Sequence, residues 1–367
     1  MRTYTHEQIY RIALHCAHRL TWQHREALLN TYGTAEAVLT RMDQGVTDIV
    51  GPKGAEELRE IRKLGARQLL ERLSACGAEV FFREEAEYPA LLRQIGDAPQ
   101  ALFVRGVLKP DEKSVAIVGS RRETRYGRTQ AFAIAKELAE NGVTVVSGLA
   151  RGIDTAAHEG ALAGGGRTVA VLGNGIDSVY PEENKALAER IIAQGGAILS
   201  EFPLGAEPLA YHFPIRNRII SGMSAAVLLI EGHAKSGTMI TAGYAAEQGR
   251  EVFALPGPVD APGSAAPLRL LREGAGICTC ARDILEDMGW AAKPETVVQE
   301  RMALPSLEGL SDLQRHIALL MQDEPKRFEE LAAESGISPD VLTGELTLLE
   351  LDGIVEARAG RIYALKF

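Results

Sequence analysis

Hydrophobic and polar positions along the chain form three successive patterns. Residues 1–75 have the periodicity of short helices over 7–19, 23–32, 34–42 and 55–75, with turn signals at Gly33, Gly45 and Gly51-Pro52. From Val80 onward, short apolar runs appear that do not alternate with polar residues, which is typical of strands covered on both faces. The pattern predicts a small helical module, residues 1–75, followed by a sheet domain.

Between residues 80 and 290, strand-like runs alternate with helical patterns. The predicted strands are 115–119, 143–147, 168–172, 197–200, 226–230 and 251–255. The predicted helices are 127–141, 155–163, 183–194, a segment near 216–222, and 238–248. This alternation predicts an α/β fold, a doubly wound, Rossmann-like parallel sheet with helices on both faces, formed by residues 80–290.

The last part of the chain has a pattern of its own. A proline-bearing stretch, 291–305, is a predicted linker to a domain of residues 306–367. Predicted helices over 310–321, 327–335 and 338–351, followed by a hairpin over 353–363, indicate a winged helix. Residues 311–367 carry 6 basic and 11 acidic side chains, a net charge of −5, and the would-be recognition helix 338–351 has no Lys or Arg. A negative surface repels a phosphate backbone, so we expect a protein-contact or purely structural role.

Composition narrows the class of protein. The N-terminus lacks a signal-peptide pattern, and no stretch approaches the roughly 18 apolar residues of a membrane helix, so we expect a cytoplasmic protein without a membrane partner. The four cysteines form no C-x-x-C pair, and Cys278 and Cys280 would share one face of a strand. Neither a disulfide framework nor a metal site is predicted.

The first predicted strand of the sheet domain ends in Gly119, Ser120, Arg121 and Arg122. Residues 119–128 hold four arginines and one acid, although the whole chain has a net charge of −9. Such a local excess of guanidinium groups indicates a ligand with phosphates. No dinucleotide fingerprint G-x-G-x-x-G and no phosphate loop G-x-x-x-x-G-K-[ST] occurs, so no cofactor is predicted.

The other strand ends add candidates, because ligands of parallel sheets bind beyond the carboxyl ends of the strands. Arg151 and Gly152 follow the second strand, and Asp154 is predicted to cap the next helix. The segment Lys235, Ser236, Gly237 and Thr238 is a predicted helix start. These cations are too many for the phosphates of one mononucleotide. They favour a polymeric ligand that is bound along its phosphate backbone.

A further segment, 211–222, combines charge with aromatic surface. Arg216 and Arg218 flank Asn217, and Tyr211 and Phe213 lie just before them. Arginines can hold phosphates, an asparagine can hydrogen-bond a base, and an aromatic ring can stack on an unpaired base. A plain helix start with Phe213 in the core is an equally good interpretation of that ring.

Seven blocks in order resemble the DNA-processing protein A family (DprA, also called Smf). They are AIVGSR at 116–121, SGLARGID at 147–154, AVLGNGID with YP at 170–181, SEFP at 200–203, FPIRNRIISG at 213–222, SGTMITA at 236–242 and EVFALPGPV at 251–259. The resemblance implies a protein that protects incoming single-stranded DNA and loads the recombinase RecA onto it during natural transformation. It implies a homodimer formed through the central domain.

The resemblance also assigns roles by position. Phosphate contacts are implied for Arg121, Arg151, Lys185, Arg216 and Arg218, and base stacking for Phe213 or Tyr211. Residues 1–75 would be a SAM-like or degenerate helix-hairpin-helix module. Its connection, residues 19–24, lacks the glycine with which related modules hold a DNA backbone, which speaks against DNA binding by this part.

The alternative is an enzyme, because the same type of sheet hosts nucleotide phosphoribohydrolases. Those enzymes carry a P-G-G-x-G-T-x-x-E signature, whereas this chain has a threonine, Thr241, where the carboxylate should stand. Glu201 and Glu231 remain nearby, and we expect both to support the arginines by hydrogen bonds. No catalytic residue is therefore predicted.

Overall fold

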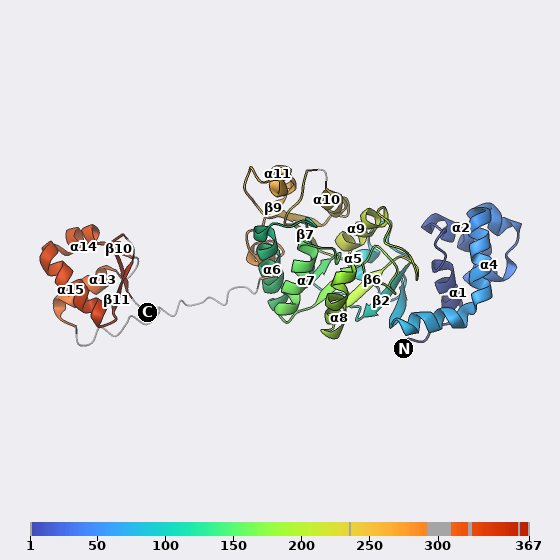
Figure 1. Ribbon diagram of the computed structural model, residues 1–367, viewed down its shortest axis with the longest axis horizontal. Helices are drawn as coiled ribbons and strands as arrows, with labels where there is room; N and C mark the ends of the chain where they lie inside the picture. The colour runs from blue at the N-terminus through green and yellow to red at the C-terminus, as the bar shows by residue number, and fades with distance from the viewer. Residues whose placement is uncertain (1, 235, 292–309, 322–324, 359, 366–367) are drawn as a thin grey trace. The chain divides into compact units, whose positions relative to one another are not determined.

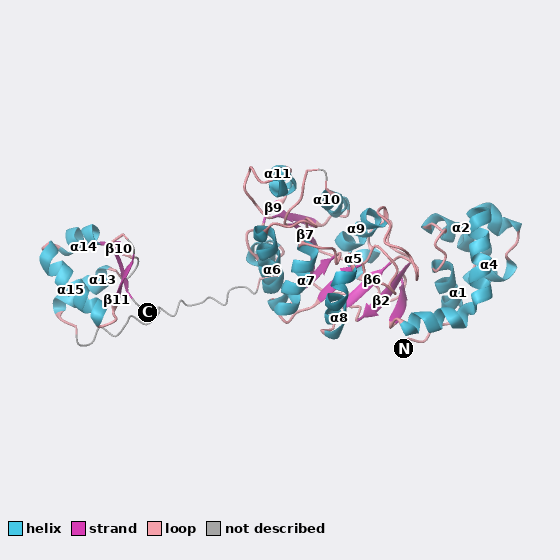
Figure 2. Cartoon of the chain, viewed as in Figure 1, coloured by secondary structure: helices cyan, strands magenta, loops and turns pink. Residues whose placement is uncertain are grey.

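The structure is a computed structural model that describes residues 2–234, 236–291, 310–321, 325–358 and 360–365. The chain divides into two compact units, Met1–Trp290 and Ala291–Phe367 (Figure 1). Figure 2 shows helices at the start of the first unit and a mixture of strands and helices in the rest of it. In the described part of the chain, no helix is long and apolar enough to span a bilayer.

The first unit starts with four helices, α1 (His6–His15), α2 (Trp22–Tyr32), α3 (Ala35–Arg41) and α4 (Gln44–Ala75). The side chains of Thr5, Thr21 and Thr34 each accept a hydrogen bond from a backbone N–H three residues on, which caps the first three. The predicted helical module is confirmed with shifted bounds. In particular, α4 begins at Gln44 and is interrupted at Gly51 and Gly65, where positive φ angles of 74° and 80° break the helical backbone.

The connection between α1 and α2 is held by a carboxylate of α4. Glu57 accepts hydrogen bonds from the backbone N–H groups of His18, at 2.8 Å, and Arg19, at 2.9 Å. Adjacent backbone N–H groups of this kind form a binding place for anions. The carboxylate of Glu57 therefore occupies both N–H donors.

Nine strands form one sheet in the first unit, in the order β1-β2-β6-β5-β4-β3-β7-β8-β9. Their bounds are β1 (Ala78–Phe82), β2 (Ala101–Gly106), β3 (Ser114–Val118), β4 (Thr144–Ser147), β5 (Thr168–Val171), β6 (Ala197–Ser200), β7 (Ala226–Leu229), β8 (Glu251–Ala254) and β9 (Gly276–Ile277). From β3 the chain runs outward through β4, β5 and β6, and then returns to β7 on the other side of β3. Such a reversal of strand order opens a crevice at the carboxyl ends of β3 and β7.

The predicted parallel sheet is confirmed, and one edge of it is antiparallel. β1 pairs antiparallel with β2, and β2 pairs antiparallel with β6, whereas the pairs from β6 to β9 are parallel. The sequence interpretation overlooked β1, β2 and β9. The runs 80–82 and 101–104 are apolar and buried, but they precede the regular alternation of strands and helices.

Helices cover both faces of the sheet, as the apolar runs predict. In β5, Val169 and Val171 belong to a core shared with α9 and α10, whereas Ala170 belongs to a core shared with α8 and the N-terminal helices. Successive strand residues point to opposite faces, so both faces must be covered to bury them all. The helices after β1 are α5 (Ala90–Arg93), α6 (Arg125–Glu140), α7 (Ile153–Ala163), α8 (Lys185–Ala193), α9 (His212–Gly222), α10 (Gly237–Glu247), α11 (Ala265–Arg272) and α12 (Ala281–Asp287), with 3-10 turns η1 (Glu182–Asn184) and η2 (Pro262–Ser264).

The second unit has the winged-helix plan. It contains α13 (Asp312–Leu320), β10 (Lys326–Arg327), α14 (Phe328–Ser335), α15 (Pro339–Leu351), β11 (Val355–Arg358) and β12 (Ile362–Leu365). The predicted two-stranded hairpin gains a third strand, because β12 lies between β10 and β11. The predicted linker 291–305 lies outside the described residues apart from its first, so the domain bounds stay a prediction.

The cysteine prediction needs one correction. β9 ends at Ile277, and Cys280 stands at the N-terminus of α12, so Cys278 and Cys280 do not share a strand face. Asp283 accepts a hydrogen bond from the backbone N–H of Cys280 at 3.2 Å, which begins this helix. All four cysteines are free thiols.

Candidate functional site

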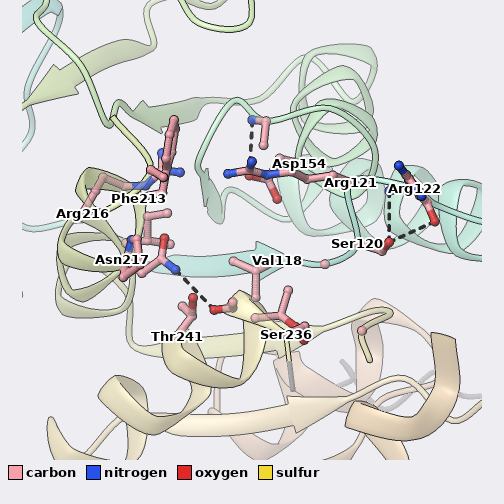
Figure 3. Close-up of a pocket in the computed structure, with 18 of the residues that line it drawn as sticks. Val118, Ser120, Arg121, Arg122, Asp154, Phe213, Arg216, Asn217, Ser236 and Thr241 are labelled. Carbon is pink, nitrogen blue, oxygen red and sulfur yellow. Dashed lines mark hydrogen bonds between the residues drawn. The ribbon is translucent and has the colours of Figure 1, made fainter. Parts of the chain in front are cut away.

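A cavity of about 670 Å³ lies at the carboxyl ends of β3 and β7, where the strand order reverses (Figure 3). It brings together ten of the predicted site residues from three separate segments. They are Gly119, Ser120, Arg121, Arg122, Phe213, Arg216, Asn217, Ser236, Gly237 and Thr238. The expectation that these strand ends converge therefore agrees with the structure.

The loop after β3 is shaped by a close approach to the start of α7. A Cβ atom on Gly119 would lie 2.5 Å from the Ile153 side chain, so only glycine fits there. The Ser120 hydroxyl accepts a hydrogen bond from Arg122 N at 3.0 Å and donates one to Arg122 O at 2.9 Å, which closes the turn. The turn leaves the two arginines exposed to solvent.

Arg121 and Arg122 have no carboxylate partner among the residues that the structure describes. Instead, the Arg121 guanidinium carbon lies 4.8 Å from the centre of the Phe213 ring, a cation–π contact (Figure 3). Tyr180 lies beside the same ring, with its centre 5.8 Å away. The cavity thus presents unpaired positive charge next to an aromatic surface.

Arg216 lines the cavity but points its guanidinium into the protein. Its side chain is almost fully buried, and Nη1 donates to the backbone oxygens of Gly148, at 2.8 Å, and Val171. Burial lowers the pKa of Arg216 to about 10, which leaves the side chain charged at neutral pH. Its described hydrogen bonds tie α9 to the ends of β4 and β5.

Asp154 accompanies Arg216 in the buried layer. One carboxylate oxygen accepts from Gly148 N at 3.1 Å and Ala150 N at 3.3 Å. Burial raises the pKa of this carboxyl, and the charge of Arg216 opposes the increase. The predicted capping role was wrong, because α7 begins after Gly152 and Asp154 lies inside its first turn, where it fixes the preceding loop.

Arg218 lies outside the cavity and is held by two acids. Nη2 contacts both carboxylate oxygens of Glu201 at 2.7 Å, and Nε lies 3.2 Å from Asp97. Glu201 thus supports an arginine, as predicted. Glu231 does not: it accepts hydrogen bonds from the backbone N–H and hydroxyl of Thr124, and so holds the start of α6.

Arg151 and Gly152 lie at the start of α7. Arg151 contributes to a second cavity of about 220 Å³, which also involves Arg121, Arg122 and Phe213. A Cβ atom on Gly152 would lie 2.3 Å from Ser120 O, and its φ of 81° also favours glycine, so the two strand-end loops touch at this point. Lys185 is exposed at the start of α8 and lines neither cavity.

The start of α10 forms the opposite wall of the larger cavity. Asn217 donates to Gly237 O at 3.4 Å, and the hydroxyls of Ser236 and Thr238 share a hydrogen bond. Backbone N–H groups at a helix start attract anions, which fits the prediction for this segment. Lys235, predicted with them, lies outside the described residues.

Among the lining residues that were not predicted as site residues are Tyr180, His233 and Thr241. Tyr180 and His233 follow the third and fifth predicted strands at the same edge as the other candidates. Their place after a strand was the available signal, but an aromatic or a histidine in a loop has many other uses. Thr241 is buried one turn into α10, and no local pattern indicates that it reaches the cavity.

Comparisons with known proteins match both units. The family model described as DNA recombination-mediator protein A matches residues 79–289, and the DprA winged helix domain matches residues 301–361. Protein Smf of Escherichia coli is 42% identical over 290 residues, which are 76% of this chain and 75% of that protein. DNA processing protein DprA of Bacillus subtilis is 41% identical over 215 residues, 58% of this chain and 70% of that protein.

Two solved structures resemble the chain as well. DNA processing protein A of Streptococcus pneumoniae aligns with a TM-score of 0.63 at 35% identity, covering 78% of this chain and 99% of that one. DNA processing protein A of Helicobacter pylori, described by its single-stranded DNA binding mode, aligns with a TM-score of 0.51 at 30% identity. This second match covers 57% of the chain and 95% of that one.

Proposed function

Because the chain belongs to the DNA recombination-mediator protein A family, we propose that it binds single-stranded DNA in the cavity at the ends of β3 and β7. The observation that carries the proposal is the pair of exposed arginines, Arg121 and Arg122, beside the Phe213 ring. A single strand offers phosphates to the guanidinium groups and unpaired bases to the ring. The H. pylori relative, described as a single-stranded DNA binder, supports it.

The binding geometry follows from the chemistry of the walls. Arg121 and Arg122 hold consecutive phosphates. The start of α10 stabilises a further phosphate by the N–H groups of Gly237 and Thr238, because the N–H of Ser236 already donates to His233 O. Phe213 stacks on a base once Arg121 moves from the ring to a phosphate.

Equilibrium binding of labelled oligonucleotides tests this proposal. We expect tighter binding of a single strand than of a duplex of equal length, because a base pair hides the surfaces that Phe213 would stack on. Affinity should fall with salt by about 0.7 in log–log slope for each phosphate neutralised. Equal binding of both forms, or binding that does not respond to salt, would contradict the proposal.

We propose further that the protein acts as a homodimer and passes its DNA to a RecA recombinase. The family description, a recombination mediator, supports the second step. The test is RecA filament formation on single strands covered by a single-strand-binding protein, with light scattering for the dimer. If RecA forms filaments at the same rate with and without the protein, the proposed transfer of DNA to RecA is wrong.

The role does not require that any bond be made or broken. Glu201 and Glu231, the carboxylates that a phosphoribohydrolase would need to use, are engaged with Arg218 and Thr124. Incubation with nucleoside monophosphates checks this, because release of a free base would show an enzyme.

For the winged helix we propose a protein contact or a structural role. α15 exposes Val341, Leu348 and Leu351, and it has no Lys or Arg along its length. An apolar, acidic helix face is a poor ligand for phosphates. Charge neutralisation at Asp340 and Glu350 should therefore leave affinity for duplex DNA negligible.

A further inference from the structure

Arg151 differs from the other two arginines of the smaller cavity in having a carboxylate partner. Its Nε donates to Oε1 of Glu183 at 2.6 Å, and its Nη2 donates to Oε2 at 3.0 Å. This two-pronged contact is the one with which a guanidinium also binds a phosphate. Glu183 therefore uses the same donors that a DNA phosphate would use.

The position of Glu183 is fixed by its neighbour. Asn184 is buried, and its Nδ2 donates to Leu149 O and to Thr155 Oγ1, both at 2.9 Å. Leu149 precedes Arg151 in the same loop, and Thr155 follows it in α7. The turn η1 is thereby fastened to the segment that carries Arg151, so the carboxylate stays within reach of the guanidinium.

Both side chains of the pair remain open to solvent, with more than half of each exposed. The hydrogen bonds from Arg151 hold the pKa of the Glu183 carboxyl below its ordinary value, so it is charged at neutral pH. An exposed pair of this kind is weak and readily exchanged. Arg121 and Arg122 have no such partner among the described residues.

We propose that Glu183 is a specificity-determining residue that competes with DNA phosphate for Arg151. The inference rests on the proposed binding of single-stranded DNA. A phosphate that reaches Arg151 must replace the carboxylate, so one ion pair is lost for each one gained. Arg151 therefore adds little to the binding of a small anion. It contacts a DNA strand after Arg121 and Arg122 already hold that strand.

The test is a double-mutant cycle on the full chain with Glu183→Gln and Arg151→Ala, using a labelled oligothymidylate. We expect Glu183→Gln to bind the strand about twofold to fivefold more tightly than the unaltered protein. Its salt dependence should steepen by about 0.7 in log–log slope, because one more unpaired cation meets a phosphate. In the Arg151→Ala background, the same substitution should have no effect.

Glu182→Gln is the matched control, because it removes the same charge one residue earlier without an ion pair among the described residues. It reports the general effect of the protein's net charge, for which we expect less than a twofold change. Glu183→Ala provides a second variant, and circular dichroism checks that each one is folded.

The outcomes separate the inference from the proposed function. If Glu183→Gln binds no more tightly than Glu182→Gln, or keeps its gain without Arg151, the competition is refuted while DNA binding stands. If the unaltered protein does not bind single strands at any salt concentration, the proposed function itself fails.

Discussion

Two pairs of arginines, one on the loop after β3 and one on α9, differ in what holds them. Arg121 and Arg122 lie on a loop, exposed and without a carboxylate partner in the described residues, whereas Arg216 and Arg218 are 3% and 7% exposed. The second pair is held by backbone oxygens and acids of the protein. The residue type is the same, yet only the first pair is available to a ligand.

The difference follows from the elements that carry them. Arg216 is three and four residues before Ile219 and Ile220, so all three share the face of α9 that packs on the sheet. Backbone oxygens at the strand ends lack partners of their own, and a buried guanidinium supplies the donors. A short turn such as 119–122 has no such face, and its side chains stay in solvent.

Arg216→Ala should have the largest effect, and it should act on stability. The change removes the donors for Gly148 O and Val171 O and leaves Asp154 buried without a nearby cation. We expect a loss on the order of 3 kcal/mol in the free energy of unfolding, measured by urea denaturation. Ile215→Ala, on the exposed side of the same helix, should cost less than about 1 kcal/mol. Equal losses would show that Arg216 is not part of the buried framework.

Arg121→Glu should act on binding and leave stability unchanged. It replaces an unpaired cation by an anion at the predicted phosphate position, so affinity for a single strand should fall about a hundredfold or more at moderate salt. Arg190→Glu, an equal charge reversal on α8 outside both cavities, is the control. Binding as tight as that of the control would remove the loop from the site.

Phe213→Leu tests the ring that Arg121 covers. Loss of the stacking surface should weaken single-strand binding about tenfold, with little change of the salt slope because no charge is altered. Phe132→Leu changes an exposed ring on α6 and should have no such effect. A change in salt slope without loss of affinity would mean that Phe213 only positions Arg121.

Mild acid, near pH 6, should have the smallest effect, and it should act on stability through the buried His158. Burial, with the charge of Arg216 adding to it, lowers the pKa of His158 from 6.5 to about 3. The unfolded chain therefore binds a proton that the folded chain does not, and stability falls as pH drops from 6.5 toward 3. At pH 6 the loss is about 1 kcal/mol, rising by about 1.4 kcal/mol for each further pH unit.

His158→Asn should flatten this part of the stability profile, measured by urea denaturation at several pH values. His15, whose pKa burial lowers to about 3 as well, keeps a similar contribution in that variant. An unchanged profile would mean that His158 takes up its proton in the folded protein.

The sequence predicts the position of the site better than the state of each side chain. Buried runs such as 115–118 and the glycines that follow them indicate strand ends, and parallel strands must bring those ends together. Whether an arginine there is free depends on acceptors far along the chain: Gly148 and Val171 for Arg216, and Glu201 with Asp97 for Arg218. Local pattern does not indicate such partners. The strands β1 and β2 were missed for another reason, because their apolar runs precede the regular alternation of strands and helices.

Neighbouring residues on the turn η1 should respond to mutation in opposite directions. Glu183 withholds Arg151 from the strand, whereas Asn184 holds the turn against the loop and start of α7 by hydrogen bonds from one amide nitrogen. A mutational scan would therefore show tighter binding of single strands at 183 beside lower stability at 184. Variants that change both residues at once would conceal these two effects.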